Sequence, residues 1–249
     1  RSAGGTVFFD ESAASSAVAT TATGSGTNNI LGWALVKDAA GVIGMGQVSG
    51  GNVVRFDSTA AAVLAADSNS STTDYTTLGN SGTLTWTNAG ALTARSVNSL
   101  SINATGNSGQ ITDMGASTNV LTLASGALQF LGSGNATLKG GQVGANASEV
   151  IIHNVGSGTF TLSSLIGGGT GSLTIDGTGT TIVSGKNAYT GGTFIGGGTV
   201  KAGSSSTCTF WRSCARARSA RASGALSCKV TSPLRQATAT ACCRLKRAW

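Results

Sequence analysis

The chain has 249 residues, of which 38 are glycine, 10% are charged and 5% are aromatic, whereas ordinary globular domains carry about 25% charged residues and about 7% glycine. The helix-favouring polar residues are scarce, and glycine costs about 1 kcal/mol per helix position relative to alanine, so the composition excludes a mainly helical protein. No run of 18 or more apolar residues occurs, which excludes a transmembrane helix.

Residues 1–80 are expected to form a less regular, β-rich N-terminal part. Within it, "FDSTAAAVLAADSN" predicts a short helix with Asp57 or Ser58 as its N-cap. Trp33, in "NILGWALV", is expected to be a core or end-cap residue. The chain begins with Arg1 and has no signal-peptide pattern near its start, so we expect an internal fragment of a longer protein.

Residues 81–203 contain short segments in which apolar and polar residues alternate, separated by Gly, Asn or Ser. The alternating apolar pairs are Leu84 and Trp86, Leu100 and Ile102, Leu121 and Leu123, Leu128 and Phe130, Val150 and Ile152, Phe160 and Leu162, and Leu173 and Ile175. Many short strands with close turn signals predict an all-β fold. Their close spacing, with few aromatic residues, favours a right-handed parallel β-helix, a β-solenoid whose coils stack on their neighbours. A β-sandwich is the alternative.

Residues 204–249 differ completely in composition. They hold all five cysteines, the only proline and nine of the sixteen basic residues, without any acidic one, so this tail carries +9 while residues 1–203 carry −2. One hypothesis is out-of-frame translation of more Gly/Thr/Leu repeat, which would give an unstructured tail. The other is a genuine basic arm that binds an anionic polymer. The cysteine spacings fit no metal site, and their odd number disfavours a disulfide framework.

No residue stands out as catalytic. His153 is the only histidine and lacks a partner at ligand spacing, so it is expected to be a surface or turn residue. The carboxylates are Asp10, Glu11, Asp38, Asp57, Asp67, Asp74, Asp113, Glu149 and Asp176. Solenoid enzymes acting on polysaccharides need clustered carboxylates; Asp113, Glu149 and Asp176 are candidates to align across coils, although we expect them to be solvated loop residues. The glycine-rich stretches match neither a phosphate-binding loop nor a calcium-binding nonapeptide, so we expect no cofactor and no metal.

The segment "SGKNAYTGGTFIGGGTVKAG" has a recognisable pattern of glycine, asparagine, tyrosine and threonine. It resembles the passenger-associated transport repeat, also called the autotransporter-associated β-strand repeat. The matching positions are Gly185, Asn187, Tyr189, Thr190, Gly191, Gly192, Thr193, Ile195, Gly198, Val200 in a leucine position, and Gly203. We expect Gly191, Gly192 and 196–198 to turn the backbone at positive φ, and Thr193, Ile195 and Val200 to lie in successive strands. The likeness covers 80–203 well and 30–80 loosely.

This resemblance implies a surface-displayed β-helical passenger of a bacterial autotransporter, exported by type V secretion. It implies an extracellular location associated with the outer membrane, and a C-terminal β-barrel translocator as a partner that this chain does not contain. The function expected is that of a non-enzymatic stalk or adhesin scaffold that aids export, with host or environmental surface glycans as candidate partners. The alternatives are a β-helical enzyme acting on polysaccharides and, if the tail is genuine, a protein that binds nucleic acid or another polyanion.

Overall fold

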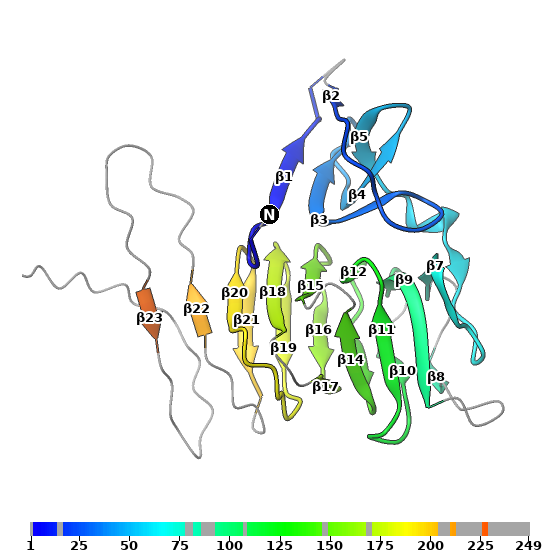
Figure 1. The fold of residues 1–249 in the computed structure, drawn as a ribbon, viewed down its shortest axis with the longest axis vertical. Coiled ribbons are helices and arrows are strands. Elements are labelled where there is room, and N and C mark those ends of the chain that lie inside the picture. The colour runs from blue at the N-terminus through cyan, green and yellow to red at the C-terminus, as the bar shows by residue number, and fades with distance from the viewer. Residues whose placement is uncertain are drawn as a thin grey trace, which may run out of the picture.

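The computed structural model describes residues 2–13, 17–77, 82–85, 93–106, 109–145, 149–167 and 171–203, with the backbone of 210–212 and 226–228. The described chain is almost entirely β-structure, and most of its strands stack as parallel coils (Figure 1). The predicted parallel β-helix is therefore confirmed, and the β-sandwich alternative is wrong. The predictions for Trp86 and for the character of 204–249 lie outside the described residues, apart from those two backbone segments.

The coils present three faces, each built from parallel strands. The first face contains β8 (Thr83–Thr85), β10 (Gln110–Asp113), β13 (Ala136–Lys139), β16 (Thr159–Leu162), β19 (Thr180–Val183) and β21 (Thr199–Ala202). The second contains β11 (Val120–Leu123), β14 (Gln142–Ala145) and β17 (Leu165–Ile166). The third contains β12 (Ala127–Leu131), β15 (Glu149–Asn154), β18 (Ser172–Gly177), β20 (Thr193–Ile195) and β22 (Phe210–Arg212).

The first coil is built around the long strand β9 (Ala94–Asn103). Its first half pairs with β11 and its second half with β12, so β9 belongs to both the second and the third face. β9 also pairs with β7 (Ser70–Thr76), which in turn pairs with β6 (Ala62–Val63). Beyond β20, β22 is followed by the antiparallel β23 (Leu226–Cys228). These strands mark the two ends of the stack.

The solenoid core consists of the apolar residues that alternate along each strand. All the predicted pairs from Leu100 and Ile102 to Leu173 and Ile175 are buried, and Leu84 packs against the same cluster. Parallel register places equivalent residues of neighbouring coils above one another, and the Phe130 and Phe160 rings stack with their centroids 5.5 Å apart. Alternation in the sequence therefore identified the core correctly, because one side of each strand faces the interior.

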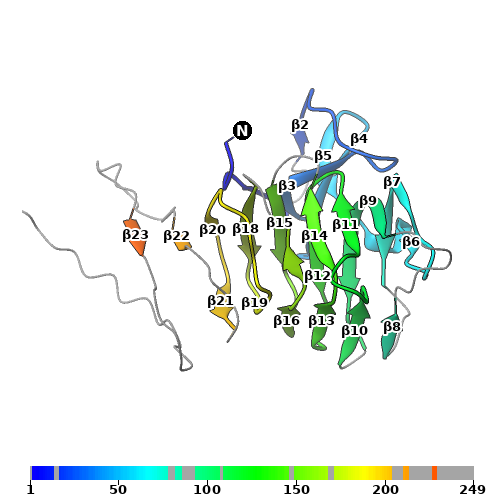
Figure 2. The same cartoon turned by 60° about the horizontal axis from the view of Figure 1, so that its bottom comes forward.

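The N-terminal part forms a second, mixed sheet that the sequence did not predict. Its order is β1 (Val7–Asp10), β3 (Ile30–Lys37), β4 (Ile43–Ser49), β5 (Asn52–Arg55) and β2 (Val18–Ala19), and only the β1–β3 pair is parallel. The sheet packs against the outer side of the third face (Figures 1 and 2). The boundary of this N-terminal part at residue 80 stays a prediction.

Two local predictions in this region can be compared with the structure. The expected helix is one short 3₁₀ turn, η1 (Ser58–Ala60), and Asp57 caps it by accepting a hydrogen bond from the Thr59 N–H. Trp33 is half-buried and packs against a small core on the mixed sheet, so it is a core residue as predicted. Among the described residues, no helix reaches the length and apolar character needed to cross a bilayer.

Candidate functional site

The three carboxylates that could have formed an active site do not come together. Asp113 lies on the first face, where it forms an ion pair with Lys139 at 3.1 Å. Glu149 and Asp176 lie on neighbouring third-face strands, but the register places Asp176 beside His153, four residues along the strand from Glu149. Four residues span about 13 Å along a strand, whereas paired carboxylates of glycosidases lie roughly 5–10 Å apart. These residues therefore do not form a glycosidase pair.

His153 and Glu149 contradict the expectation that they are surface, turn or loop residues. Both lie in β15 and are buried, because the mixed sheet covers the outer side of the third face. The His153 ring Nε2 is hydrogen-bonded to the Gly32 carbonyl oxygen at 2.9 Å. Glu149 accepts hydrogen bonds from the Gly4 N–H at 2.7 Å and from the Thr174 hydroxyl. Both side chains connect the two sheets.

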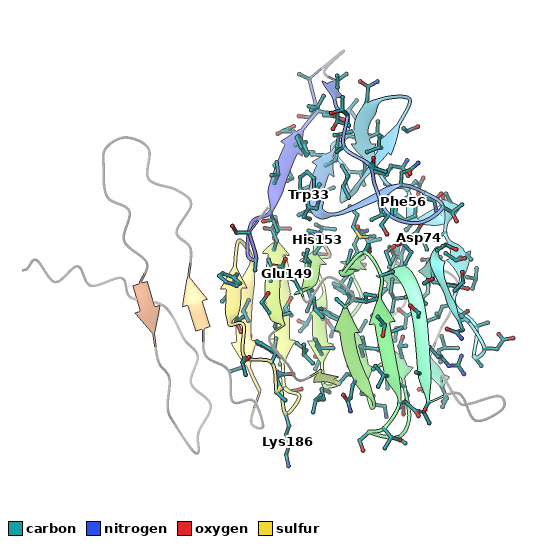
Figure 3. The ribbon with its side chains drawn as sticks, in the orientation of Figure 1. Trp33, Phe56, Asp74, Glu149, His153 and Lys186 are labelled. Carbon is teal, nitrogen blue, oxygen red and sulfur yellow. The ribbon has the colours of Figure 1, made fainter. Side chains whose placement is uncertain are left out.

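A belt of buried polar side chains on the third face, namely Gln129, Glu149 and His153, joins the mixed sheet to the solenoid. Figure 3 places Trp33, Phe56, Asp74, Glu149 and His153 along this junction. The Gln129 side-chain oxygen, also in the belt, accepts a hydrogen bond from the Met45 N–H at 2.5 Å. Apolar packing supports the same contact, since Ile30, Met45 and Phe56 of the N-terminal part form one buried cluster with Ala61 and Ala127. Buried polar groups need such partners, so the belt explains how a polar sheet face is covered.

The first coil has two buried ionic groups with structural partners. Asp74 accepts hydrogen bonds from Asn28, Asn98 and Ser99 at 2.9, 2.7 and 2.6 Å. Arg95 is in register with the inward-facing Leu121, so its side chain lies at the end of the core, where it donates to the Ala66 carbonyl oxygen. Burial lowers the pKa of the Arg95 guanidinium, and the nearby Asp67 charge opposes this effect. Asp74 and Arg95 therefore stabilise the N-terminal end of the solenoid through these hydrogen bonds.

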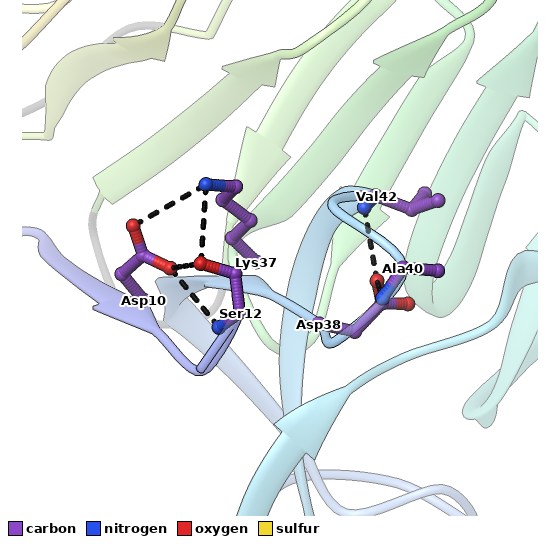
Figure 4. Close-up of polar contacts among 6 residues, drawn as sticks. All are labelled: Asp10, Ser12, Lys37, Asp38, Ala40 and Val42. Atoms are coloured by element: carbon purple, nitrogen blue, oxygen red, sulfur yellow. Dashed lines mark hydrogen bonds and ion pairs between the residues drawn. The ribbon is translucent and has the colours of Figure 1, made fainter. Parts of the chain in front are cut away.

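The carboxylates of the mixed sheet are held in local turns (Figure 4). Asp10 accepts hydrogen bonds from the N–H and hydroxyl of Ser12 and lies 3.4 Å from the Lys37 ammonium. Asp38 accepts from the N–H groups of Ala40 and Val42 and forms a 2.6 Å ion pair with Arg55.

The Ser12 hydrogen bonds hold the pKa of Asp10 below its usual value, and the Arg55 hydrogen bond does the same for Asp38. Within the described ranges, no three His, Cys, Asp or Glu residues are grouped so that they could hold a metal ion. The local contacts in these two turns therefore explain the positions of Asp10 and Asp38.

The repeat-like segment 185–203 forms the last complete coil of the described chain. Thr193 and Ile195 lie in β20, and Val200 lies in β21 and packs against the core. The Asn187 side-chain oxygen accepts a hydrogen bond from the Ile166 N–H of the preceding coil at 2.9 Å. Tyr189 packs against the core, and its hydroxyl lies 2.5 Å from the Thr193 hydroxyl. Asn187 therefore fastens this coil to the preceding one, whereas the contact between Tyr189 and Thr193 lies within the coil.

The glycines of the same segment serve mainly to let coils approach one another. A β-carbon added at Gly185 would lie 2.1 Å from the Ser164 carbonyl oxygen, and one at Gly203 would lie 2.3 Å from the Ser184 β-carbon. Gly192 and Gly198 have φ of +92° and +71°, as expected for turns. Gly191, Gly196 and Gly197 do not have positive φ, contrary to the expectation.

The two remaining positions of the motif are Thr190 and Gly191. Both are exposed, and the Gly191 N–H donates to the Gly171 carbonyl oxygen of the preceding coil at 2.8 Å. Tight spacing between coils, more than turn geometry alone, therefore explains the glycine content of this segment. The sequence contains no direct signal for such close approaches.

Comparison with known proteins gives one informative similarity. The chain is 34% identical over 119 residues to the Adhesin BmaC autotransporter of Brucella suis biovar 1 (strain 1330). The matched region is 47% of this chain and only 3% of the length of that relative. No protein-family model matches the chain, and no solved structure matches it. The likeness to an autotransporter adhesin thus has independent support, while membership of the particular transport-repeat family stays a prediction.

Proposed function

We propose that this chain is a passenger segment of an autotransporter-type adhesin, displayed at the bacterial cell surface as a β-helical scaffold. The observation that carries the proposal is the similarity to an autotransporter adhesin in a chain whose described residues stack as parallel coils. An adhesin scaffold needs length and rigidity more than a reaction centre. The separated carboxylates and the structural role of His153 favour this function over catalysis.

The same coil geometry supports a role in export. On the first face, β10, β13, β16 and β19 each pair with the equivalent strands of the coils before and after them, so the stack can grow one coil at a time as the chain emerges. Residues 1–203 contain no cysteine, and a chain without disulfides can cross a membrane unfolded. The partner implied is an outer-membrane translocator. Surface glycans are the proposed binding partners, through the exposed threonine, serine and asparagine side chains.

Surface display can be tested with the full-length parent protein in its own bacterium. A peptide tag placed between Gly50 and Gly51, an exposed turn where an added β-carbon meets no atom within 4 Å, should leave the fold intact. We expect a tag-specific antibody to label intact cells, added protease to remove the label, and deletion of the gene to reduce binding of the cells to glycan-coated surfaces. Labelling only after cell lysis would contradict the proposal.

The two rival functions predict different results. If the parent is an enzyme acting on polysaccharides, it should depolymerise them, and Asp113→Ala or Asp176→Ala should abolish this activity; such a result would overturn the scaffold function. If the basic tail is genuine, binding to anionic polymers should weaken as salt rises and disappear on deletion of 204–249. Sequencing the gene across codons 200–215 tests the tail directly, because a one-base correction should restore Gly/Thr/Leu repeats.

A further inference from the structure

Residues 1–203 contain four Asn-x-Ser/Thr motifs, which begin at Asn69, Asn103, Asn135 and Asn146. This motif is the acceptor sequence for N-linked glycosylation, in which a sugar is attached to the asparagine side chain. A chain rich in asparagine, serine and threonine contains such motifs often, so the motif alone does not identify a modified site. The structure describes the first three, whereas Asn146 lies outside the described residues.

Asn135 lies at the corner that precedes β13, and it is exposed. Its side-chain oxygen accepts a hydrogen bond from the Thr159 N–H of the next coil at 2.8 Å. This N–H donor identifies the bonded amide atom as the oxygen, so the other amide atom, Nδ2, points away from the next coil. Within the described chain this Nδ2 makes no hydrogen bond. A sugar on Nδ2 would therefore leave the bond to Thr159 intact.

Asn69 repeats this arrangement at the other end of the solenoid. It precedes β7, is exposed, and its side-chain oxygen accepts a hydrogen bond from the Ser96 N–H at 2.8 Å. The hydroxyl that completes its motif belongs to the exposed Ser71. In the motif of Asn135 the hydroxyl belongs to Thr137, which lies on the outer side of β13 between buried residues. Both motifs therefore present their asparagine Nδ2 and their hydroxyl side chain outside the core.

Asn103 has the same motif in a different environment. Its side chain is buried, and its oxygen accepts a hydrogen bond from the Thr105 N–H at 3.0 Å. The next coil lies directly on this stretch, because the Ala104 N–H donates to the Leu131 carbonyl oxygen at 2.9 Å and a β-carbon added at Gly132 would lie 2.4 Å from the Thr105 nitrogen. A sugar at Asn103 would have to separate the two coils. The structure thus distinguishes three motifs that the sequence leaves equivalent.

The composition of the surface gives a physical reason for attached sugars. Residues 1–203 carry a net charge of only −2, and a protein surface with a net charge near zero favours association and precipitation. Glycans attached to asparagine are bulky and solubilising. Two glycans on opposite ends of the described solenoid would supply hydrophilic bulk that the charged side chains do not.

We propose that Asn69 and Asn135 are N-glycosylation sites of the folded protein. The Nδ2 atom attacks the anomeric carbon of an activated sugar, which is linked to a nucleotide diphosphate or to a lipid pyrophosphate. A carbon–nitrogen bond forms, the bond from that carbon to the phosphate oxygen breaks, the phosphate leaves with the electron pair, and Nδ2 loses one proton. The sugar donor and the transferase come from the cell that makes the protein. The order of glycosylation and folding does not change the expected sites, because a chain with a sugar at Asn103 could not stack its coils there.

The test is mass spectrometry of proteolytic peptides from the full-length parent protein, purified from the cells that naturally make it. We expect the peptides with Asn69 and Asn135 to be heavier by whole sugar units, and Asn103 to be unmodified. A single sugar at each site would indicate a nucleotide-linked donor, whereas a preassembled oligosaccharide would indicate a lipid-linked one. The proposal goes beyond the scaffold function, and peptide masses report on it independently of surface display.

Substitutions at the hydroxyl position provide matched controls. Thr137→Val removes the motif but keeps the side-chain shape and the bond between Asn135 and Thr159, so the sugar at Asn135 should be lost completely while the thermal midpoint stays unchanged. Thr137→Ser retains the motif and should retain the sugar. Ser71→Ala and Ser71→Thr make the same comparison for Asn69.

Three results would overturn the proposal. A site whose peptide carries no sugar in the parent protein is not a glycosylation site, and absence from both peptides removes the proposal altogether. Loss of the sugar in Thr137→Ser as well as in Thr137→Val would show that the motif is not what the transferase recognises. Equal occupancy of Asn103 and Asn135 in the folded protein would show that burial between coils does not select the sites.

Discussion

Replacing Gly185 with alanine should destabilise the protein by about 2–3 kcal/mol, the upper part of the range for overpacking a core. The added β-carbon would lie 2.1 Å from the Ser164 carbonyl oxygen, more than 1 Å inside ordinary contact. The obstacle is backbone of the preceding coil, so no side-chain rotation relieves it, and the two coils must separate locally. That separation also weakens the hydrogen bond between Asn187 and the Ile166 N–H.

Gly144→Ala is the matched control for this substitution. Gly144 lies in β14 of the same solenoid, its φ is not positive, and an added β-carbon meets nothing within 4 Å. The same chemical change should therefore leave stability unchanged or raise it by up to about 1 kcal/mol, because alanine restricts the unfolded chain. The contrast between the two variants isolates the steric contact between coils from the general effect of removing a glycine.

Urea unfolding followed by circular dichroism measures the difference, since a lower midpoint at unchanged slope reports lost stability. For a chain of this size, 2–3 kcal/mol corresponds to a thermal midpoint lower by about 4–12 °C. If Gly185→Ala and Gly144→Ala agree within about 0.5 kcal/mol, close approach of the coils is not the reason for glycine at position 185. The explanation offered for the motif glycines would then fail as well.

Three further predictions concern single polar contacts. Tyr189→Phe removes the hydroxyl that meets Thr193 and should cost about 1 kcal/mol in urea unfolding; no change would show that the contact is not formed in solution. Gln129→Ala leaves the buried Met45 N–H without its acceptor and should lower the free energy of unfolding by about 1–3 kcal/mol. Hydrogen exchange should become faster in the mixed sheet than in the solenoid; an equal change in both would show that this bond does not hold the mixed sheet on the solenoid. The Gly115 N–H, with help from the Lys139 charge, holds the pKa of Asp113 below its usual value, so this carboxylate stabilises the fold at neutral pH. That contribution should be lost as pH falls below about 4 toward the folded-state pKa, and Asp113→Asn should show a flatter acid dependence than the wild type.

The solenoid could be predicted from sequence because its physical causes are local. In "TFTLSS" and "VLTLAS" the apolar residues alternate, and each strand buries one side in the same core. Glycine and asparagine between such segments indicate corners. Parallel stacking then follows from the short, regular spacing of the strands, since successive coils can bury their inward side chains only against one another.

The mixed sheet could not be predicted in the same way. β3 reads as a nearly continuous apolar run because it is covered on both sides, by the solenoid and by a small core around Leu31, Ala34 and Val36. Such a run carries no alternation from which to assign a face. The expectation for His153 and Glu149 was wrong for a different reason. Both residues alternate with the inward-facing Val150 and Ile152 along β15, which correctly places them on the outer side of the solenoid. The sequence does not indicate that another sheet covers this outer side.

The repeat-like segment 185–203 contains both residues with local causes and residues that depend on a distant part of the chain. Its alternating residues Thr193 and Ile195 follow the rule for a strand, whereas Gly185 and Gly203 respond to atoms of the preceding coil that are about twenty residues away. A motif of this kind therefore records two constraints at once, the direction in which side chains point and the distance at which coils stack. The second constraint depends on the coil length, which falls to 19 residues at this point of the solenoid. A motif that fits one coil length should therefore recur only where neighbouring coils have that length.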